Sequence, residues 1–230
     1  MTLSLNDKAK TLFKDRMCIC LDDLSSHVST KAPSKLEFFT EFLNFLADLS
    51  PPHECFELGD SRYYENDEYL NREILNYSEN NGVERDTEEY FIVDSIRHAF
   101  ISFNFGGLYN LYKHREAENW YPKIIIRQKL TDIKLEGELV IFRGTSTDEY
   151  NSGVFSQSWT LSEEVASDFA YKHYDIHDDY LNTERVVLKS RIKACYVYCY
   201  DEDDDEKEVI IDERELLVLP PVIVSQKILN

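Results

Sequence analysis

The second half of the sequence places polar residues at the ends of three apolar, strand-like runs. A guanidinium can grip phosphate, a hydroxyl can orient a neighbouring side chain, and a carboxylate can stabilise a developing positive charge. Each motif by itself has an ordinary explanation as a turn, a helix cap or a solvated face, so their order along the chain carries the information. The groups are Arg143 in VIFRGTS, Ser158 and Thr160 in SQSWTLS, and Glu213 and Glu215 in IIDERELLV.

Helix capping is the ordinary explanation for the middle motif. Thr160 and Glu163 have the spacing of a capping box, and an apolar helical face follows them. The sequence therefore predicts a helix over residues 162–172 with Thr160 as its cap. Capping gives no role to Ser158 or Trp159, which stand just before that helix.

The first half of the sequence has the period of helices. Ser34 and Glu37 predict a helix that ends before the prolines at 51–52. Asp86 and Glu89 predict another, which runs to the glycine pair 106–107. A shorter helix is expected over residues 108–116, and residues 51–66 read as a loop.

The second half changes to the pattern of short strands, interrupted by the one helix after Thr160. The sequence therefore predicts an α+β protein in which helices come first and strands follow. We expect a helical N-terminal region, residues 1–120, packed on a core formed by residues 121–230 within one continuous domain. The expected strands are 124–126, 139–142, 154–159, 186–192, 196–200, 209–211, 216–219 and 222–224.

Composition limits the class of protein. With 43% apolar residues in a chain of 230, the protein can bury a substantial core. The net charge of −19 disfavours binding to a phosphate backbone, although a basic strip at residues 113–134 offers a local anion site. The cysteine spacing favours free thiols, and His53 with Cys55 would supply only half of a metal site, so no metal is expected. Without a leader or a membrane-spanning run, we expect a cytoplasmic protein with no membrane partner.

The order of the three motifs resembles that of the Arg-Ser-Glu class of mono-ADP-ribosyltransferases. In that class one strand carries arginine, a second carries Ser-Thr-Ser and leads into a helix, and Glu-x-Glu directly precedes an apolar strand. Arg143, Ser158 and the pair Glu213 and Glu215 keep this order within residues 122–228, with Trp159 at the middle position of the serine motif. The resemblance implies a split two-sheet core that holds NAD, with the helices packed outside it.

The resemblance also implies how NAD would be cleaved. Glu215 would stabilise the positive charge that develops on the ribose as nicotinamide leaves, as in glycoside hydrolysis, and Ser158 would orient Glu215. Arg143, Gly144 and Thr160 would line the NAD site, with the Arg143 guanidinium on the diphosphate or on the ribose of the adenylate side.

The acceptor follows from the second carboxylate of the Glu-x-Glu motif. The resemblance implies that Glu213 positions an incoming guanidinium and helps to remove its proton, which favours protein arginine as the acceptor. Tyr174 and Tyr180 are candidates for stacking on nicotinamide. The acidic run DEDDDEKE, residues 201–208, reads as a solvated turn or as a rim that attracts a basic acceptor.

Other functions stay open at this point. The same chemistry could act on a nucleobase of RNA or DNA, which the basic strip supports and the net charge opposes. An acidic, non-enzymatic protein could instead mimic nucleic acid or bind a partner, and a degenerate transferase could bind a dinucleotide without turnover. We expect an enzyme that uses NAD as a co-substrate and no metal. By analogy it would be an intracellular toxin, defence protein or effector, with a neutralising antitoxin or chaperone in its producer.

Overall fold

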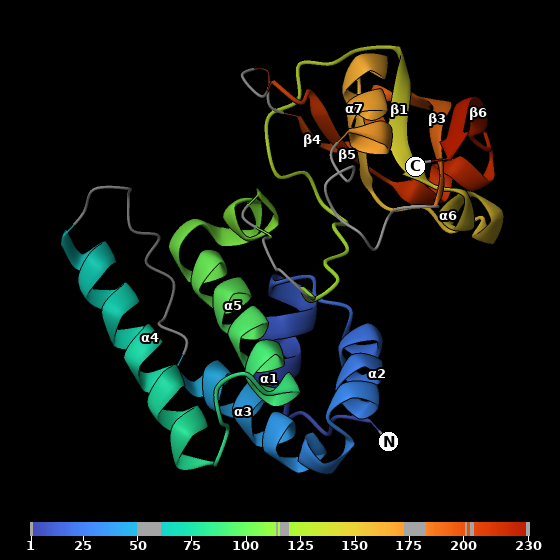
Figure 1. Ribbon diagram of the computed structural model, residues 1–230. Helices are drawn as coiled ribbons and strands as arrows, with labels where there is room; N and C mark the ends of the chain where they lie inside the picture. Colours follow the sequence, from blue (N-terminus) through green and yellow to red (C-terminus); the bar gives the residue numbers. More distant parts are fainter. Residues whose placement is uncertain are drawn as a thin grey trace. The chain divides into compact units, whose positions relative to one another are not determined.

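The computed structural model describes residues 2–49, 61–113, 115, 120–172, 183–200, 202 and 205–228, with only the backbone of residues 61–66. The chain forms two compact units, Met1–Ile125 and Ile126–Asn230 (Figure 1). The described residues form seven α-helices and one six-stranded antiparallel sheet, which confirms the predicted α+β class. None of the described helices combines the length and the apolar character that a membrane span requires.

Apolar residues at helical spacing build the first unit. The helix predicted from Ser34 is present as α3 (Leu36–Leu49), preceded by a 3-10 turn at Pro33–Lys35. Its predicted apolar face is buried, including Phe39 and Phe42. The other helices of the unit are α1 (Asp7–Lys10), continued by a π-helical segment (Thr11–Arg16), α2 (Leu21–Lys31), α4 (Ser61–Asn80) and α5 (Glu88–Lys113).

The break in α5 was predicted correctly, whereas the start of α4 was not. The predicted break at the glycine pair is confirmed, because Gly107 interrupts α5 with φ 64°, a backbone conformation that other residues rarely adopt. The loop predicted for residues 51–66 was wrong from Ser61 onward, where α4 begins. The buried stripe of α4 contains few apolar residues, such as Leu70 and Ile74, so its helical period is weak in the sequence.

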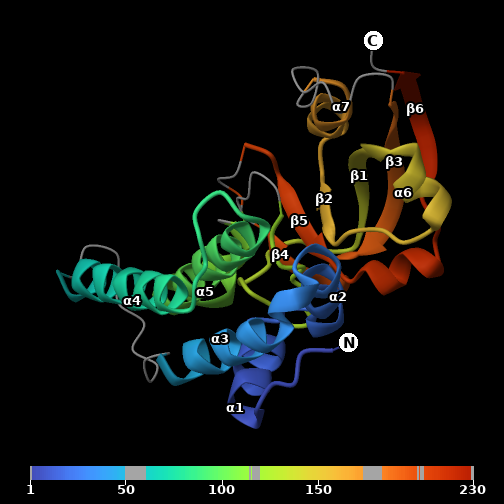
Figure 2. The same cartoon turned by 60° about the horizontal axis from the view of Figure 1, so that its bottom comes forward.

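The second unit is built around the sheet, whose strands lie in the order β4-β5-β2-β1-β3-β6 (Figure 2). Two predicted strands do not form. In 124–126, Ile124 makes an isolated bridge to Ile19, and 216–219 overlaps a 3-10 helix, η5 (Glu213–Leu217). The strands are β1 (Glu138–Ser146), β2 (Ser158–Thr160), β3 (Glu184–Lys193), β4 (Val197–Tyr200), β5 (Glu208–Ile211) and β6 (Val222–Ile228).

The two faces of the sheet are covered differently. On one face Trp159 is 2% exposed and packs into the main core of the unit, which explains a large apolar residue between two polar ones on a strand. On the other face α7 (Glu163–Tyr171) lies against β1 (Figure 1), where Phe142 and Ala166 belong to a smaller buried cluster. A short helix, α6 (Thr147–Ser152), follows β1 directly.

Gly144 is where the backbone of α7 approaches β1. A Cβ at this position would overlap the carbonyl oxygen of Ala166 and the amide nitrogen of Ala170, both of which are main-chain atoms that cannot rotate away. The contact that the structure gives Gly144 is therefore helix packing. The NAD-binding role that the resemblance implies for Gly144 stays a prediction.

Gly144→Ala should destabilise the second unit by roughly 1–3 kcal/mol, because the added methyl group forces α7 away from the sheet. Urea unfolding of the variant and of the wild type would measure the difference. Unchanged stability would show that α7 can shift outward at no cost, and would contradict the packing role.

Candidate functional site

Three neighbouring strands bring the chemistry-bearing residues together. Arg143 and Ser158 are 15 residues apart in sequence, and Ser158 and Glu208 are 50 apart, yet β1, β2 and β5 are adjacent in the sheet. β1 and β2 pair at Phe142 and Thr160, and the described strands share no further pair. Next to this pair, Nη1 of Arg143 donates to the carbonyl oxygen of Ser158 at 2.7 Å, so a side chain joins the two strands where the ladder stops.

The Ser158 hydroxyl donates to the carboxylate of Glu208, the first residue of β5. The register explains this contact. Thr160 pairs directly with Glu208, and Ser158 lies two residues from Thr160 on the same face of β2. Ser158 is therefore hydrogen-bonded on both sides, to Arg143 through its main-chain oxygen and to Glu208 through its hydroxyl.

The resemblance implied that Ser158 orients Glu215, but the Ser158 hydroxyl forms its hydrogen bond elsewhere. Glu215 lies in η5, beyond the end of β5, while Glu208 begins that strand. No residue that the structure describes forms a hydrogen bond or an ion pair with the Glu215 carboxylate. The Ser158 hydroxyl is instead satisfied by Glu208, seven positions earlier in the sequence.

Thr160 contacts the residue two positions before Glu208. Its hydroxyl donates to the main-chain oxygen of Glu206 at 2.7 Å and accepts from the amide of Ser162 at 3.0 Å. Ser162 is the residue that caps α7, by accepting from the amide of Val165. The prediction that Thr160 is the helix cap was therefore wrong by two residues.

The backbone between the two glutamates has an unusual conformation. Lys207 has φ 48°, in the left-handed region that residues other than glycine rarely adopt. Its carbonyl oxygen accepts from the amide of Leu161, which holds this turn against the segment that follows β2. Such conformations cost free energy and are concentrated at functional sites, where the surrounding structure holds them.

Arg143 is held by a partly buried ion pair. Its Nε and Nη2 each lie 3.1 Å from an oxygen of Glu149, on α6, and both side chains are about one-fifth exposed. Burial raises the pKa of Glu149, but the charge and hydrogen bonds of Arg143, with smaller contributions from Thr145 and Ser156, outweigh it and bring the pKa below its ordinary value. The carboxylate therefore stays ionised beside the guanidinium.

Glu213 is engaged in a different contact from the one expected. Both of its carboxylate oxygens accept from Arg127, at 2.5 and 2.7 Å. Burial raises the pKa of Glu213, and the Arg127 hydrogen bond and charge reverse this, so the pKa is lowered overall. Glu213 thus ties η5 to the chain segment that precedes the sheet, and the expected strand directly after Glu215 is absent.

Asp212 fixes the turn between β5 and η5. It is 5% exposed and accepts hydrogen bonds from the Arg214 side chain and amide and from the Tyr198 hydroxyl. The hydrogen bond from the Arg214 side chain is the main cause that lowers the pKa of Asp212 from 3.8 to about 2, against the opposing effect of burial.

This depressed pKa predicts a loss of stability in acid. Above pH 3.8 the carboxylate is ionised in the folded and unfolded chains and its full contribution, roughly 2 kcal/mol, is present; it is lost as the pH falls toward 2. Asp212→Asn should remove this part of the pH dependence. Urea titrations of both proteins at a series of pH values would measure it, and parallel curves would show that another group is responsible.

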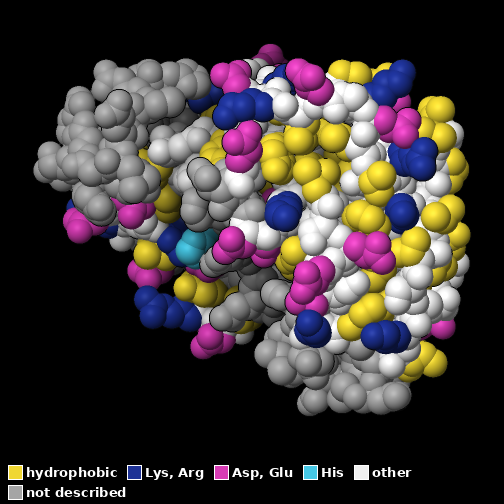
Figure 3. All heavy atoms as spheres, turned by 90° about the horizontal axis from the view of Figure 1, so that it is seen from above, with side chains coloured by type: hydrophobic (Ala, Val, Ile, Leu, Met, Phe, Trp, Pro, Cys, Tyr) yellow, Lys and Arg dark blue, Asp and Glu magenta, His cyan; other side chains and the backbone are white. Residues whose placement is uncertain are grey.

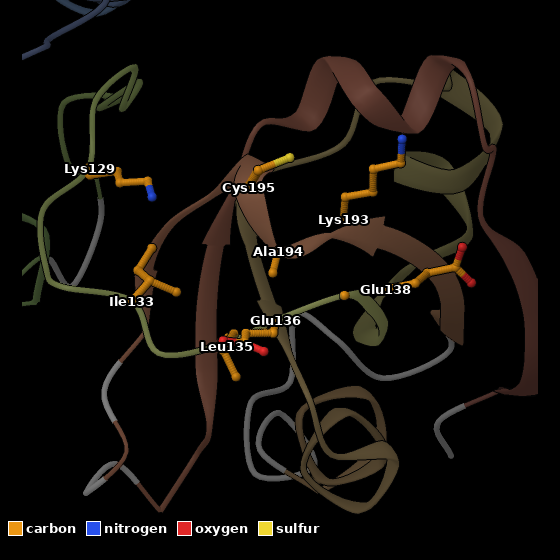
Figure 4. A pocket seen from close by; sticks show the side chains of 9 residues that line it. Lys129, Ile133, Leu135, Glu136, Glu138, Lys193, Ala194 and Cys195 are labelled. Carbon is orange, nitrogen blue, oxygen red and sulfur yellow. The ribbon is translucent and has the colours of Figure 1, made fainter.

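A hollow of about 560 Å³ lies at the opposite end of β1 and contains none of the residues above. Figure 4 shows that its charged side chains do not point toward one centre: Lys193 and Glu138 extend away from Lys129. Among the described residues, no three His, Cys, Asp or Glu side chains gather closely enough to hold a metal ion. The hydrogen-bonded group of Arg143, Ser158 and Glu208 is therefore the better candidate site.

The surface charge is mixed where it can be seen. On the face drawn in Figure 3, acidic side chains of the described residues alternate with basic and apolar ones and form no continuous acidic surface.

The tyrosines expected to stack on nicotinamide, Tyr174 and Tyr180, lie outside the described residues. The basic strip is partly neutralised, since Arg127 pairs with Glu213 and Lys134 with Glu202.

Comparison of the chain with family models, with curated proteins and with solved structures finds no match.

The sequence contains a signal that could have pointed to Glu208. The segment EKEVII places Glu206 and Glu208 directly before the apolar residues VII, which together with Glu208 form β5. The acidic residues that precede this pair concealed it, because the whole run resembles a solvated turn.

Proposed function

We propose that this protein is a mono-ADP-ribosyltransferase that cleaves NAD and transfers ADP-ribose to a macromolecular acceptor. The observation that carries the proposal is the hydrogen-bonded group of Arg143, Ser158 and Glu208 across three adjacent strands. The sequence resemblance requires an arginine on one strand, a serine on a second strand and a glutamate next to a third. These three residues supply them, with Glu208 in place of Glu215.

Glu206 and Glu208 also satisfy the resemblance better than Glu213 and Glu215 do. Glu206 stands just before β5 and Glu208 begins that strand, whereas Glu213 and Glu215 lie within a 3-10 helix. Both polar residues of the serine motif contact this pair. Ser158 bonds the Glu208 carboxylate, and Thr160 bonds the Glu206 main chain.

The chemistry assigned to Glu208 is electrostatic. As the bond between nicotinamide and ribose breaks, its electron pair leaves with nicotinamide and positive charge develops on the sugar. A carboxylate fixed beside the sugar stabilises this charge more in the transition state than in the bound substrate. The hydrogen bond from Ser158 restricts the rotation of that carboxylate, which explains a serine at the beginning of a short strand.

Glu206 is the residue that we assign to the acceptor. Its side chain is exposed, while Thr160 anchors its main chain. An arginine acceptor is protonated at neutral pH and must lose a proton to attack the ribose carbon, and an exposed carboxylate two residues from Glu208 can take that proton. Protein arginine is therefore the acceptor that this arrangement favours.

Incubation of the purified protein with NAD tests the donor half of the proposal, with free nicotinamide as the measured product. Labelled NAD added to a cell lysate tests the acceptor half. Label that is removed by protease and not by nuclease supports a protein acceptor, and the opposite result would assign the chemistry to nucleic acid. A protein that releases no nicotinamide in either experiment would contradict the proposal.

A further inference from the structure

A single carboxylate on α6 joins β1, which carries Arg143, to the segment just before β2, which carries Ser158. Glu149 accepts from two nitrogens of Arg143, as described above, and from the amide of Ser156 at 3.0 Å. It also accepts from the Thr145 hydroxyl. Arg143 and Thr145 belong to β1, and Ser156 precedes Ser158 by two residues. Glu149 therefore connects β1 to the approach of β2 at the place where the two strands share a single residue pair.

The same contacts limit what Arg143 can do. Two of its three guanidinium nitrogens face Glu149, and the third donates to the Ser158 carbonyl oxygen. The positive charge is thus neutralised, and a phosphate group would have to displace a carboxylate that is held by three residues. This arrangement suits a strut between the strands better than an open phosphate-binding group.

We infer that Glu149 is a positioning residue that acts through Arg143 and Ser156 to hold Ser158 in the orientation that bonds Glu208. The catalytic consequence rests on the proposed function, whereas the effect on the hydrogen bond between Ser158 and Glu208 does not. Because Glu149 touches neither Glu208 nor the Ser158 side chain among the described contacts, its influence passes through the backbone of β2.

The kinetic test uses Glu149→Gln, which preserves the shape of the side chain but removes the charge that faces Arg143. The kcat for nicotinamide release, measured per folded molecule well below the melting temperature, should fall about 10- to 100-fold, because a small displacement of an orienting group has effects of this size. The KM for NAD should stay near its wild-type value, since the inferred role is in orientation and not in binding. Glu149→Asp keeps the charge and should recover part of the kcat.

Asp148→Asn is the matched control, because it removes an exposed charge from the same turn of α6. It should leave kcat at the wild-type level. Tighter NAD binding by Glu149→Gln with normal kcat would show that Glu149 competes with NAD for Arg143. A lower melting temperature with normal kcat would make it a purely structural residue. Either result overturns the inference.

A second measurement needs no NAD and no activity. The carboxyl carbon resonance of Glu208, assigned by its disappearance in Glu208→Gln, reports the hydrogen bond from Ser158. Ser158→Ala defines the change in chemical shift when that bond is lost. Glu149→Gln should move the Glu208 resonance in the same direction. If the glutamine variant does not fold, Glu149→Asp replaces it in this measurement. An unmoved resonance refutes the role of Glu149 even in an active enzyme, whereas a wild type that releases no nicotinamide refutes the proposed function alone.

Discussion

Glu208→Gln is expected to lower nicotinamide release by about two to three powers of ten, the usual loss when one preorganised electrostatic contact is removed. The amide keeps the size of the carboxylate and can still accept the hydrogen bond from Ser158. It lacks the negative charge that opposes the positive charge on the ribose. Nicotinamide release at saturating NAD measures the effect, and circular dichroism shows whether the fold is retained.

Glu215→Gln is the matched control for this experiment, since it makes the same chemical change in η5 at a carboxylate that forms no hydrogen bond or ion pair with the described residues. It should keep near-normal NAD cleavage. An active Glu208→Gln together with an inactive Glu215→Gln would return the catalytic role to Glu215. The hydrogen bond between Ser158 and Glu208 would then be only structural.

Glu206→Gln is expected to suppress transfer of ADP-ribose to protein by about 10²- to 10⁴-fold, the range that general-base catalysis contributes. Cleavage of NAD by water should survive to a large extent, because departure of nicotinamide requires Glu208 and Ser158 but no second carboxylate. Both activities can be read from one reaction, as nicotinamide released and as ADP-ribose attached. The physical reason is that a guanidinium must lose a proton before it can attack, whereas neutral water can attack first and release its proton afterwards.

Asp205→Asn also removes an exposed charge, from the residue beside Glu206, and should affect neither activity. If Glu206→Gln reduced transfer and hydrolysis together, Glu206 would belong to the NAD site, and the argument for arginine would lapse. Transfer that continued at the wild-type rate would favour an acceptor that needs no base, such as the amine of a nucleobase.

The sequence by itself determined the features that depend on near neighbours. The α+β class, the buried face of α3 and the break at Gly107 follow from local period and from the conformational freedom of glycine. The placement of Arg143 and Ser158 on strands was also within reach of the sequence, because each belongs to an apolar, strand-like run. These properties require no knowledge of which distant segments meet.

Only the tertiary structure decided which pair of glutamates meets Ser158. Glu206 and Glu208 precede the apolar residues VII, and Glu213 and Glu215 precede LLV, so local spacing cannot separate the two pairs. Pairing of β2 with β5 separates them. Burial of Trp159 and Val209 on the same face fixes the register, which sets Glu208 opposite Thr160. Glu213 forms an ion pair with Arg127, a residue 86 positions away. A contact between residues so far apart in the sequence depends on how the segments pack together and not on local spacing.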